Sequence, residues 1–351
     1  IALFNLGNIY IFEEYGHLNI SKAIECFKRS ADLGNTLSQY IIGMIYSQKE
    51  YYSINIEKAI HYFNLAANKG DANSLSNLGL IYLDKQNVNK AIEYFEKGAS
   101  YNDKIACFNL GRIYYDKKYK KVDINKAIHY FTLAANQSFS EAQYLLGGIY
   151  LSQKDVKKSI YYYELSAKLG NVKSSFNLWI IYSEKEHKVV NIEKAIKYLK
   201  MAAERNDMNA QFRLGCLYYE GEYLQKNIKN AIFYLKLSAK QSHSDANFML
   251  GTIYHEGRFV PQNIDDAITF YREGSSFNDN KSKNNLAIIF KNYPKYRRNI
   301  YNVIEYLNEG IKMKSCPYSS YNLARIYYFG IGVNKNVIES TKLLKKTSED
   351  G

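Results

Sequence analysis

The residues that could do chemistry are few in this chain of 351 residues, and they share no catalytic spacing. None of the six histidines lies at metal-ligand spacing or beside a plausible nucleophile. The chain contains no phosphate-binding loop, dinucleotide fingerprint, nucleophile elbow or His-Glu-x-x-His motif. His61 and His129 both occur within the sequence Ala-Ile-His-Tyr-Phe, which indicates a structural position used twice. We therefore expect no enzymatic activity, no cofactor and no metal site.

The cysteines do not form a recognisable site either. They lie far apart in the sequence and match neither a disulfide framework nor a zinc-binding spacing. Buried free thiols favour a reducing compartment, so we expect a cytoplasmic protein. No apolar run is long enough to span a membrane. The four cysteines are Cys26, Cys107, Cys216 and Cys316.

Polar residues that could bind a partner form a row at a regular spacing, and most of them are asparagines. A row of side-chain amides can hydrogen-bond the backbone of an extended peptide. Two lysines lie four residues before an asparagine of the row, a spacing that places each pair on one helix face. The alternative explanation is that Asn is simply common in this chain. The candidate partner-binding residues are Asn77, Asn109, Lys173, Asn177, Arg213, Lys281, Asn285 and Asn322.

A repeat positions these candidates. Two residues after each row position comes a small residue, usually Gly after Leu, and the successive steps are 36, 36, 32, 36, 32, 36, 36, 36 and 37 residues. A fixed period in this range is typical of repeat proteins. Because Gly within a helix costs about 1 kcal/mol relative to Ala, we expect it to allow close approach of a partner helix. The small-residue row is Gly7, Gly43, Gly79, Gly111, Gly147, Trp179, Gly215, Gly251, Ala287 and Ala324.

A second row, of Asn or Asp, has the same steps and marks the start of another helix. Such side chains can accept a hydrogen bond from a backbone N–H at a helix start. Apolar residues then follow at helical spacing, as in Ile56, Ala59, Ile60 and Phe63. Each repeat is therefore predicted to be helix–turn–helix. The cap row is Asn19, Asn55, Asn87, Asp123, Asp155, Asn191, Asn227, Asn263, Asn299 and Asn336.

Ten such repeats fill the chain, and its three prolines are consistent with uninterrupted helices. The sequence predicts an all-α protein, a right-handed α/α superhelical solenoid that grows by stacking repeats. In the shorter repeats only the connector between the two helices loses residues. The array is expected to be a single domain over 1–351, with repeats at 1–36, 37–72, 73–104, 105–140, 141–172, 173–208, 209–244, 245–280, 281–317 and 318–351.

Together these motifs resemble the Sel-1-like repeats, relatives of the tetratricopeptide repeats. The tenth repeat carries Leu323-Ala324-Arg325-Ile326-Tyr327 and then Gly330-Ile331-Gly332-Val333, and the second ends with Ala66-Ala67-Asn68-Lys69-Gly70. Ordinary tetratricopeptide repeats, with a period of 34 residues, are the alternative. The Ala-Ala-x-x-Gly ending and the steps of 36 residues favour the Sel-1-like family.

The resemblance implies a non-enzymatic protein–protein interaction scaffold or adaptor, for example in signalling, within a larger protein. Its partner is expected in the concave groove lined by the first helices. The Lys and Asn pairs are similar to the Lys-x-x-x-Asn arrangement by which some tetratricopeptide domains hold an acidic C-terminus. Other proteins or peptides, acidic ones included, are therefore the expected partners, together with a kinase or other domain of the same parent chain.

The net charge of +13 leaves a second class of function open, a helical-repeat RNA binder. Such a protein needs a continuous basic stripe and a recurrent pair of base-reading side chains. Here the basic residues form scattered clusters, such as those at 117–121 and 342–346, and acidic residues interrupt them. Basic clusters on exposed faces also serve solubility. We therefore expect a protein partner rather than a nucleic acid.

Overall fold

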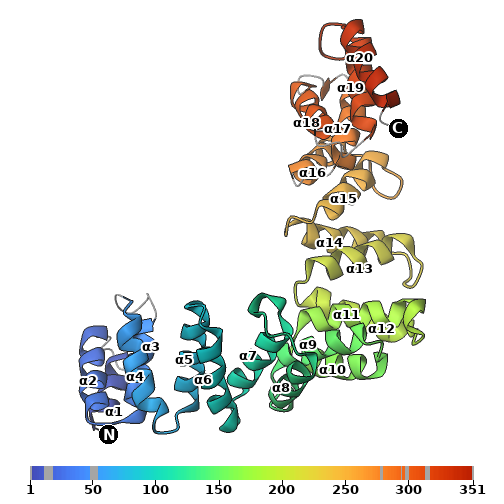
Figure 1. The fold of residues 1–351 in the computed structure, drawn as a ribbon. Coiled ribbons are helices and arrows are strands. Elements are labelled where there is room, and N and C mark those ends of the chain that lie inside the picture. Colours follow the sequence, from blue (N-terminus) through green and yellow to red (C-terminus); the bar gives the residue numbers. More distant parts are fainter. Residues whose placement is uncertain are drawn as a thin grey trace. The chain divides into compact units, whose positions relative to one another are not determined.

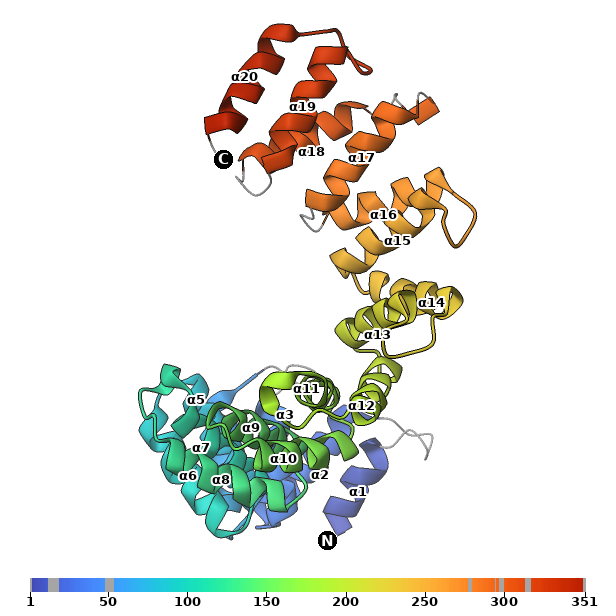
Figure 2. The same ribbon diagram turned by 90° about the vertical axis from the view of Figure 1, so that its right-hand side faces the viewer.

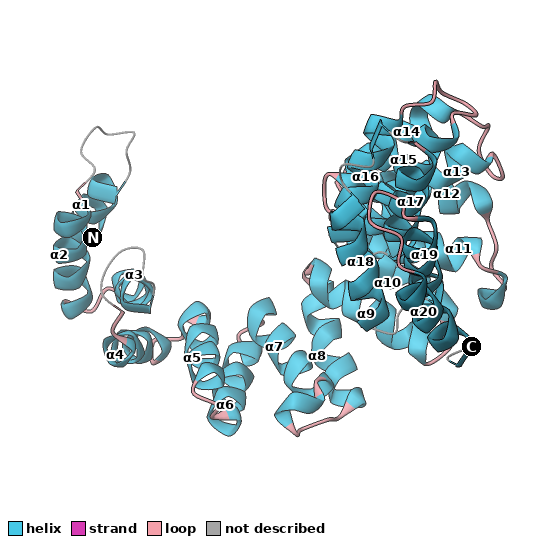
Figure 3. Ribbon diagram, turned by 90° about the horizontal axis from the view of Figure 1, so that it is seen from above, coloured by secondary structure: helices cyan, strands magenta, loops and turns pink. Residues whose placement is uncertain are grey.

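The computed structural model describes residues 2–11, 19–47, 54–276, 280–293, 295–296, 300–312 and 317–349. Over these residues the chain forms α-helices and short 3-10 helices joined by loops, without a strand (Figure 3). The chain divides into two compact blocks, Ile1–Ser174 and Ser175–Gly351, and each is described by itself. The predicted all-α solenoid fold is confirmed.

Over the described residues, twenty α-helices alternate between the first and the second helix of a repeat, and the two helices of each pair lie side by side (Figures 1 and 2). The first helices are α1 (Ala2–Ile11), α3 (Thr36–Ser47), α5 (Ala72–Asp84), α7 (Lys104–Tyr115), α9 (Ser140–Ser152), α11 (Val172–Ser183), α13 (Met208–Glu220), α15 (Ser244–Glu256), α17 (Asn280–Asn292) and α19 (Pro317–Phe329). The second helices are α2 (Ile20–Asp32), α4 (Ile56–Ala67), α6 (Val88–Ser100), α8 (Ile124–Asn136), α10 (Val156–Lys168), α12 (Ile192–Glu204), α14 (Ile228–Ala239), α16 (Ile264–Ser276), α18 (Ile300–Lys312) and α20 (Val337–Glu349).

The cap row begins the second helices, as the sequence predicts. Each described member accepts a hydrogen bond from the backbone N–H three residues further on, at 2.9 to 3.1 Å. Its own backbone N–H donates to the carbonyl of a tyrosine near the end of the first helix, as from Asn55 to Tyr46 at 2.9 Å. One residue therefore starts a helix and fixes it to the helix before. Asn299 lies outside the described residues.

Connector length varies between repeats without changing the helices. The connector from α5 to α6 comprises only residues 85–87, and the one from α9 to α10 comprises 153–155. The connector from α7 to α8 is longer and contains the 3-10 helix η2 (Lys117–Tyr119). Short and long connectors end in the same backbone bond to a tyrosine carbonyl, from Asn87 and from Asp123. The steps of 32 residues are therefore connector deletions, as predicted.

Most glycines of the small-residue row pack directly against rings of the second helices, and Gly215 packs against Leu235. A Cβ atom added at Gly79 would lie 2.4 Å from the ring of Phe95, and one added at Gly111 would lie 2.5 Å from Phe131. Both rings are fully buried. The expected close approach of the second helix is confirmed, because even one methyl group would overlap the ring.

A leucine replaces the ring in the repeats of Ala287 and Trp179, where the row departs from Gly, and also opposite Gly215. The position equivalent to Phe95 holds a leucine, Leu307, in the repeat of Ala287, and the two belong to one hydrophobic core. In the repeat of Trp179 the equivalent position holds Leu199, which is also buried. Gly with a ring and Ala with leucine fill similar volumes, so the two helices keep complementary surfaces.

Many tyrosines lie where the two helices of a repeat meet. In seven repeats the tyrosine whose carbonyl accepts the cap bond stacks on an aromatic residue of the second helix, with ring centroids 5.4 to 6.1 Å apart and planes within 12°. In several repeats a lysine of the second helix covers the same tyrosine, as Lys90 covers Tyr82 at 4.3 Å. The stacked pairs are Tyr46–Tyr62, Tyr82–Tyr94, Tyr114–Tyr130, Tyr150–Tyr162, Tyr182–Tyr198, Tyr218–Tyr234 and Tyr254–Phe270.

The Gly79 contact can be tested by a double substitution. Gly79→Ala gains helix propensity but forces a methyl group into the buried Phe95 ring, and overpacking of this kind costs about 1–3 kcal/mol. We expect lower stability, and we expect Phe95→Leu to relieve it, since an Ala with a leucine occurs naturally in the repeat of Ala287. Chemical denaturation of both single variants and the double variant measures the coupling. Strictly additive losses would show that the two positions do not compete for one space.

The cap contact gives an independent test at Asn87. Asn87→Ala removes the acceptor for the Lys90 backbone N–H and is expected to cost about 1 kcal/mol. Asn87→Asp is the matched control, because aspartate fills the same role at Asp123 and Asp155. Hydrogen exchange of the amides at the start of α6 measures the local effect. Equal exchange rates in Asn87→Ala and the natural chain would contradict the capping role of Asn87.

Candidate partner-binding face

The first helices present one accessible face, which we call the first-helix face. It consists of the residues two before and one after each small residue, and a spacing of three residues places both on one side of a helix. First helices of successive repeats also contact each other within a block, as α3 does α5, and α15 does α17. Most side chains at these positions are half-buried or exposed, among them Leu80, Ile288 and Arg112.

In the N-terminal block the predicted asparagines use their amide groups within their own helices. The amide nitrogen of Asn77 donates to the carbonyl of Asn73 at 2.8 Å, and that of Asn109 donates to the carbonyl of Ile105 at 2.9 Å. Such bonds to the preceding turn are common for short polar side chains in helices. Asn109 is only 5% exposed, so it offers little surface to a partner. Asn77 is half-buried.

In the C-terminal block two predicted asparagines bond to neighbouring helices. The amide of Asn285 donates to the hydroxyl of Tyr271 at 2.9 Å, and the amide of Asn322 donates to the side-chain oxygen of Asn284 at 3.0 Å. Tyr271 is fully buried, and burial raises the pKa of its hydroxyl. These bonds fix the direction of both amides on the first-helix face.

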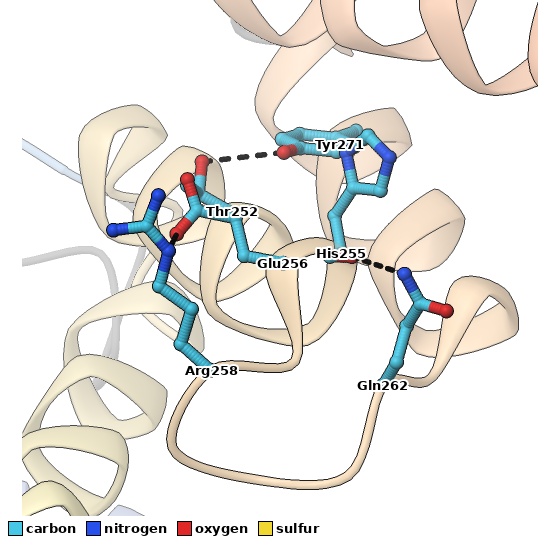
Figure 4. A network of polar contacts seen from close by, with 6 residues as sticks. All are labelled: Thr252, His255, Glu256, Arg258, Gln262 and Tyr271. Atoms are coloured by element: carbon cyan, nitrogen blue, oxygen red, sulfur yellow. Dashed lines mark hydrogen bonds and ion pairs between the residues drawn. The ribbon is translucent and has the colours of Figure 1, made fainter.

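The network around Tyr271 extends into the connector at residues 257–263 (Figure 4). Thr252 and Tyr271 share a hydrogen bond of 3.2 Å between their hydroxyls. Gln262 donates to the carbonyl of His255 at 2.8 Å, and Arg258 pairs with Glu256 at 3.3 Å. The connector is therefore tied back to the end of α15, beside the row that holds Asn285.

The predicted basic residues differ in what surrounds them. Lys173 is exposed and lies in α11, one turn before the half-buried Asn177. Lys281 is exposed and lies 5.7 Å from the centroid of the Phe248 ring. Arg213 is half-buried, and its guanidinium lies 5.4 Å from the ring of Trp179. The structure therefore holds Lys281 and Arg213 against aromatic rings of the preceding repeats.

A cavity of about 240 Å³ adds residues that the sequence analysis missed. It lies between α17 and α19 on the first-helix face and joins the predicted Asn322 to Arg325 and Ile288. The signal was present, because Ile288 and Arg325 follow Asn285 and Asn322 by three residues. The sequence analysis followed one row only. The residues lining the cavity are Ala287, Ile288, Asn292, Asn322, Arg325, Ile326 and Ile331.

The thiols and acidic groups of the described chain form no reactive centre. Cys26, Cys107 and Cys216 are buried free thiols, and burial raises the pKa of Cys107 to about 11 and that of Cys216 to about 12. Thiols with pKa values as high as those of Cys107 and Cys216 stay protonated at neutral pH and are poor nucleophiles. Within the described ranges no cluster of His, Cys, Asp and Glu could hold a metal ion. Cys316 lies outside these ranges.

None of the helices in the described part of the chain combines the length and the apolar character needed to cross a bilayer.

Paired helices with a repeated cap, a small-residue row and an accessible first-helix face define a helical-repeat protein. The model of the Sel1 repeat matches residues 1–35, 36–71, 104–139, 140–171, 187–207, 209–243, 244–276 and 317–351. A tetratricopeptide repeat model matches residues 74–104, the repeat with the short connector after α5. The chain belongs to the Sel1 repeat family, whose members are typically non-catalytic.

Solved structures show the same fold. The c5321 protein, a protective antigen of uropathogenic Escherichia coli strains, is similar with a TM-score of 0.70 and 22% identity, over 93% of this chain and 79% of that one. A Sel1 repeat protein from Oxalobacter formigenes is similar with a TM-score of 0.68 and 22% identity, over 82% of this chain and 86% of that one. No curated protein is similar enough in sequence to count as a match.

Two half-buried histidines predict that the C-terminal block is sensitive to acid. Burial is the main cause that lowers the pKa of His243 and of His255 from 6.5. The unfolded chain therefore takes up protons first as the pH falls below 6.5, and stability is lost over that range. His243 caps α15 by accepting from the Ala246 N–H at 3.3 Å.

The variant His243→Asn keeps a capping acceptor and removes the titration. Its melting temperature is expected to fall less between about pH 8 and about pH 5 than that of the natural chain. Thermal unfolding followed by circular dichroism provides the comparison. The same acid-induced drop in both proteins would show that His243 does not contribute to the effect.

Proposed function

We propose that this chain is a non-enzymatic scaffold that binds an acidic protein or peptide through the first-helix face. The Sel1 and tetratricopeptide repeat families are generally protein-interaction scaffolds, which supports this class of function. The observation that carries the proposal for this chain is the composition of that face in the C-terminal block. It combines oriented amides, arginines and apolar side chains, as at Asn285, Asn322, Arg325 and Ile288.

An extended peptide suits this composition. Side-chain amides can bond to a peptide backbone, and arginines can bind carboxylates with two parallel hydrogen bonds. Exposed Ile288, beside the cavity between α17 and α19, provides an apolar contact for a side chain of the partner. The buried free thiols fit a reducing compartment, and we place the protein in the cytoplasm.

Two double variants test the proposal. Lys281→Ala with Asn285→Ala, and Lys173→Ala with Asn177→Ala, each remove a cation and an amide one turn apart. The probe is a fluorescein-labelled peptide that ends in Glu-Glu-Leu-Asp with a free C-terminus, and binding is measured by anisotropy. Loss of a charged hydrogen bond is worth about 1.5–3 kcal/mol, so each double variant is expected to bind at least about tenfold more weakly.

The control places equivalent changes on a second helix. Lys157→Ala with Tyr161→Ala alters two exposed residues of α10 that are also four residues apart, and it should leave the affinity unchanged. A salt-dependent gel shift with single-stranded RNA runs in parallel. Tight, strongly salt-sensitive RNA binding, with no effect of the double variants on the peptide, would replace the scaffold by the RNA-binding alternative.

A further inference from the structure

Two residues that depart from the repeat pattern lie in contact with each other. Trp179 occupies the small-residue row, in which every other member is Gly or Ala. Arg213 is the one charged residue of the row two positions before it, where the other members are Asn, Ile, Leu or Met. The guanidinium of Arg213 lies 5.4 Å from the centroid of the Trp179 ring. The other repeats form their helix pairs without such residues, so the fold does not require this pair.

Neighbouring side chains position the pair. Trp179 lies in α11 and packs on Phe176, with ring centroids 5.3 Å apart. Leu199 of α12, which is fully buried, stands where several other repeats have a ring. Arg213 comes from α13, the first helix of the next repeat. Both members of the pair are half-buried, so each is held by the protein and reached by solvent.

Arg213 has unused hydrogen-bonding capacity. Its Nε atom is enclosed and makes no hydrogen bond in the described part of the chain. Among the described residues no carboxylate forms an ion pair with Arg213, although Glu220 and Asp245 lie near enough to raise the pKa of Cys216. A guanidinium resting on a ring without a counterion is a receptor for an anion.

The surroundings of Arg213 select a single carboxylate rather than a polyanion. Helices α13 and α15 contain no other Lys or Arg. The Cys216 thiol, three residues after Arg213, lies 3.6 Å from the sulfur of Met249 and stays protonated, because burial raises its pKa to about 12. The carboxylates of Glu220 and Asp245 also act on this thiol. A nucleic acid needs several cations along its backbone. One cation beside apolar groups fits an acidic side chain next to an apolar one.

We propose that Arg213, supported by Trp179, binds the carboxylate of an acidic residue flanked by apolar residues in a peptide partner. This inference rests on the proposed scaffold function and assigns one contact within it. The planar guanidinium provides two parallel donors, and the indole fixes its plane. Met249, at the equivalent position of α15, provides an adaptable apolar contact for the neighbouring side chain of the peptide.

The chain has a single tryptophan, so the emission of Trp179 reports binding at this site directly. The probe is the capped peptide acetyl-Gly-Leu-Glu-Leu-Gly-amide, with the Gln-containing peptide as its neutral counterpart. The Glu peptide is expected to change the emission saturably, and the Gln peptide is expected to bind at least about tenfold more weakly. This comparison needs no variant, so it holds even where a substitution disturbs folding.

Two substitutions of Arg213 and one control complete the experiment. Arg213→Met keeps the length of the side chain without its charge and should weaken the Glu peptide at least about tenfold. Arg213→Lys keeps the charge without the planar fork and should recover only part of the affinity. Arg29→Met is the control, because Arg29 is an exposed arginine of the second helix α2 and lies outside the first-helix face. It should leave the Trp179 response unchanged.

Calorimetry with the same peptides separates failure of this site from failure of the scaffold. In one outcome the Glu peptide releases the same heat on binding to Arg213→Met as to the natural chain, without any change in Trp179 emission. That result would overturn the assignment of Arg213 and leave the scaffold function in place. An equal Trp179 response to inorganic phosphate would replace the carboxylate by a general anion site. Absence of any binding, by these peptides and by the Glu-Glu-Leu-Asp peptide, would count against both proposals.

Discussion

The contact between the small-residue row and the rings of the second helices is the constraint on which the rest of the structure depends. At Gly43, Gly79 and Gly111 the ring occupies the space that a Cβ atom would take. This brings the two helices of a repeat so close that the cap residue can reach the carbonyl of the preceding tyrosine and the tyrosine can stack across the pair. Each repeat is closed by these contacts together.

The side of the first helix that packs on the second is therefore committed to the fold, and the opposite side is the accessible one, through which we propose that the protein recognises a partner. The helix turns by about 100° per residue, so positions two before and one after the small residue face away from the ring. Their side chains vary more than the small residues do, with Asn, Arg, Met and Ile at equivalent places. Variation without loss of packing is what a binding surface on a repeat protein requires.

Much of the fold could be predicted from the sequence because each structural feature recurs at the same position of several repeats. The cap row, the close approach at Gly and the connector deletions all follow from spacing, and the structure shows them. The contacts of the candidate residues on the first-helix face were predictable only in part. Spacing identified the helix face that carries Asn109, but not that its amide would bond within α7 and leave it buried.

Side-chain contacts between repeats could not be predicted from the sequence, and the reason is physical. Spacing along one helix gives no distance to the next, so the meeting of Arg213 with Trp179 and the cavity that joins Asn322 to Ile288 required coordinates. Both involve side chains whose reach exceeds one helical turn. The sequence alone nevertheless shows that Trp179 and Arg213 differ from the residues at the equivalent positions of the other repeats. The structure shows that these two residues are in contact.

The backbone bond from the cap residue to the tyrosine carbonyl has a consequence for how such an array can change. The bond closes the connector at its base in the short connector that ends at Asn87 and in the longer connector with its own 3-10 turn that ends at Asp123, so the register of the helices does not depend on connector length. Insertions and deletions there leave the helix register untouched. The connectors can thus change in length and form contacts of their own without altering the first-helix face. The connectors and the first-helix face are therefore two surfaces that can change in sequence separately.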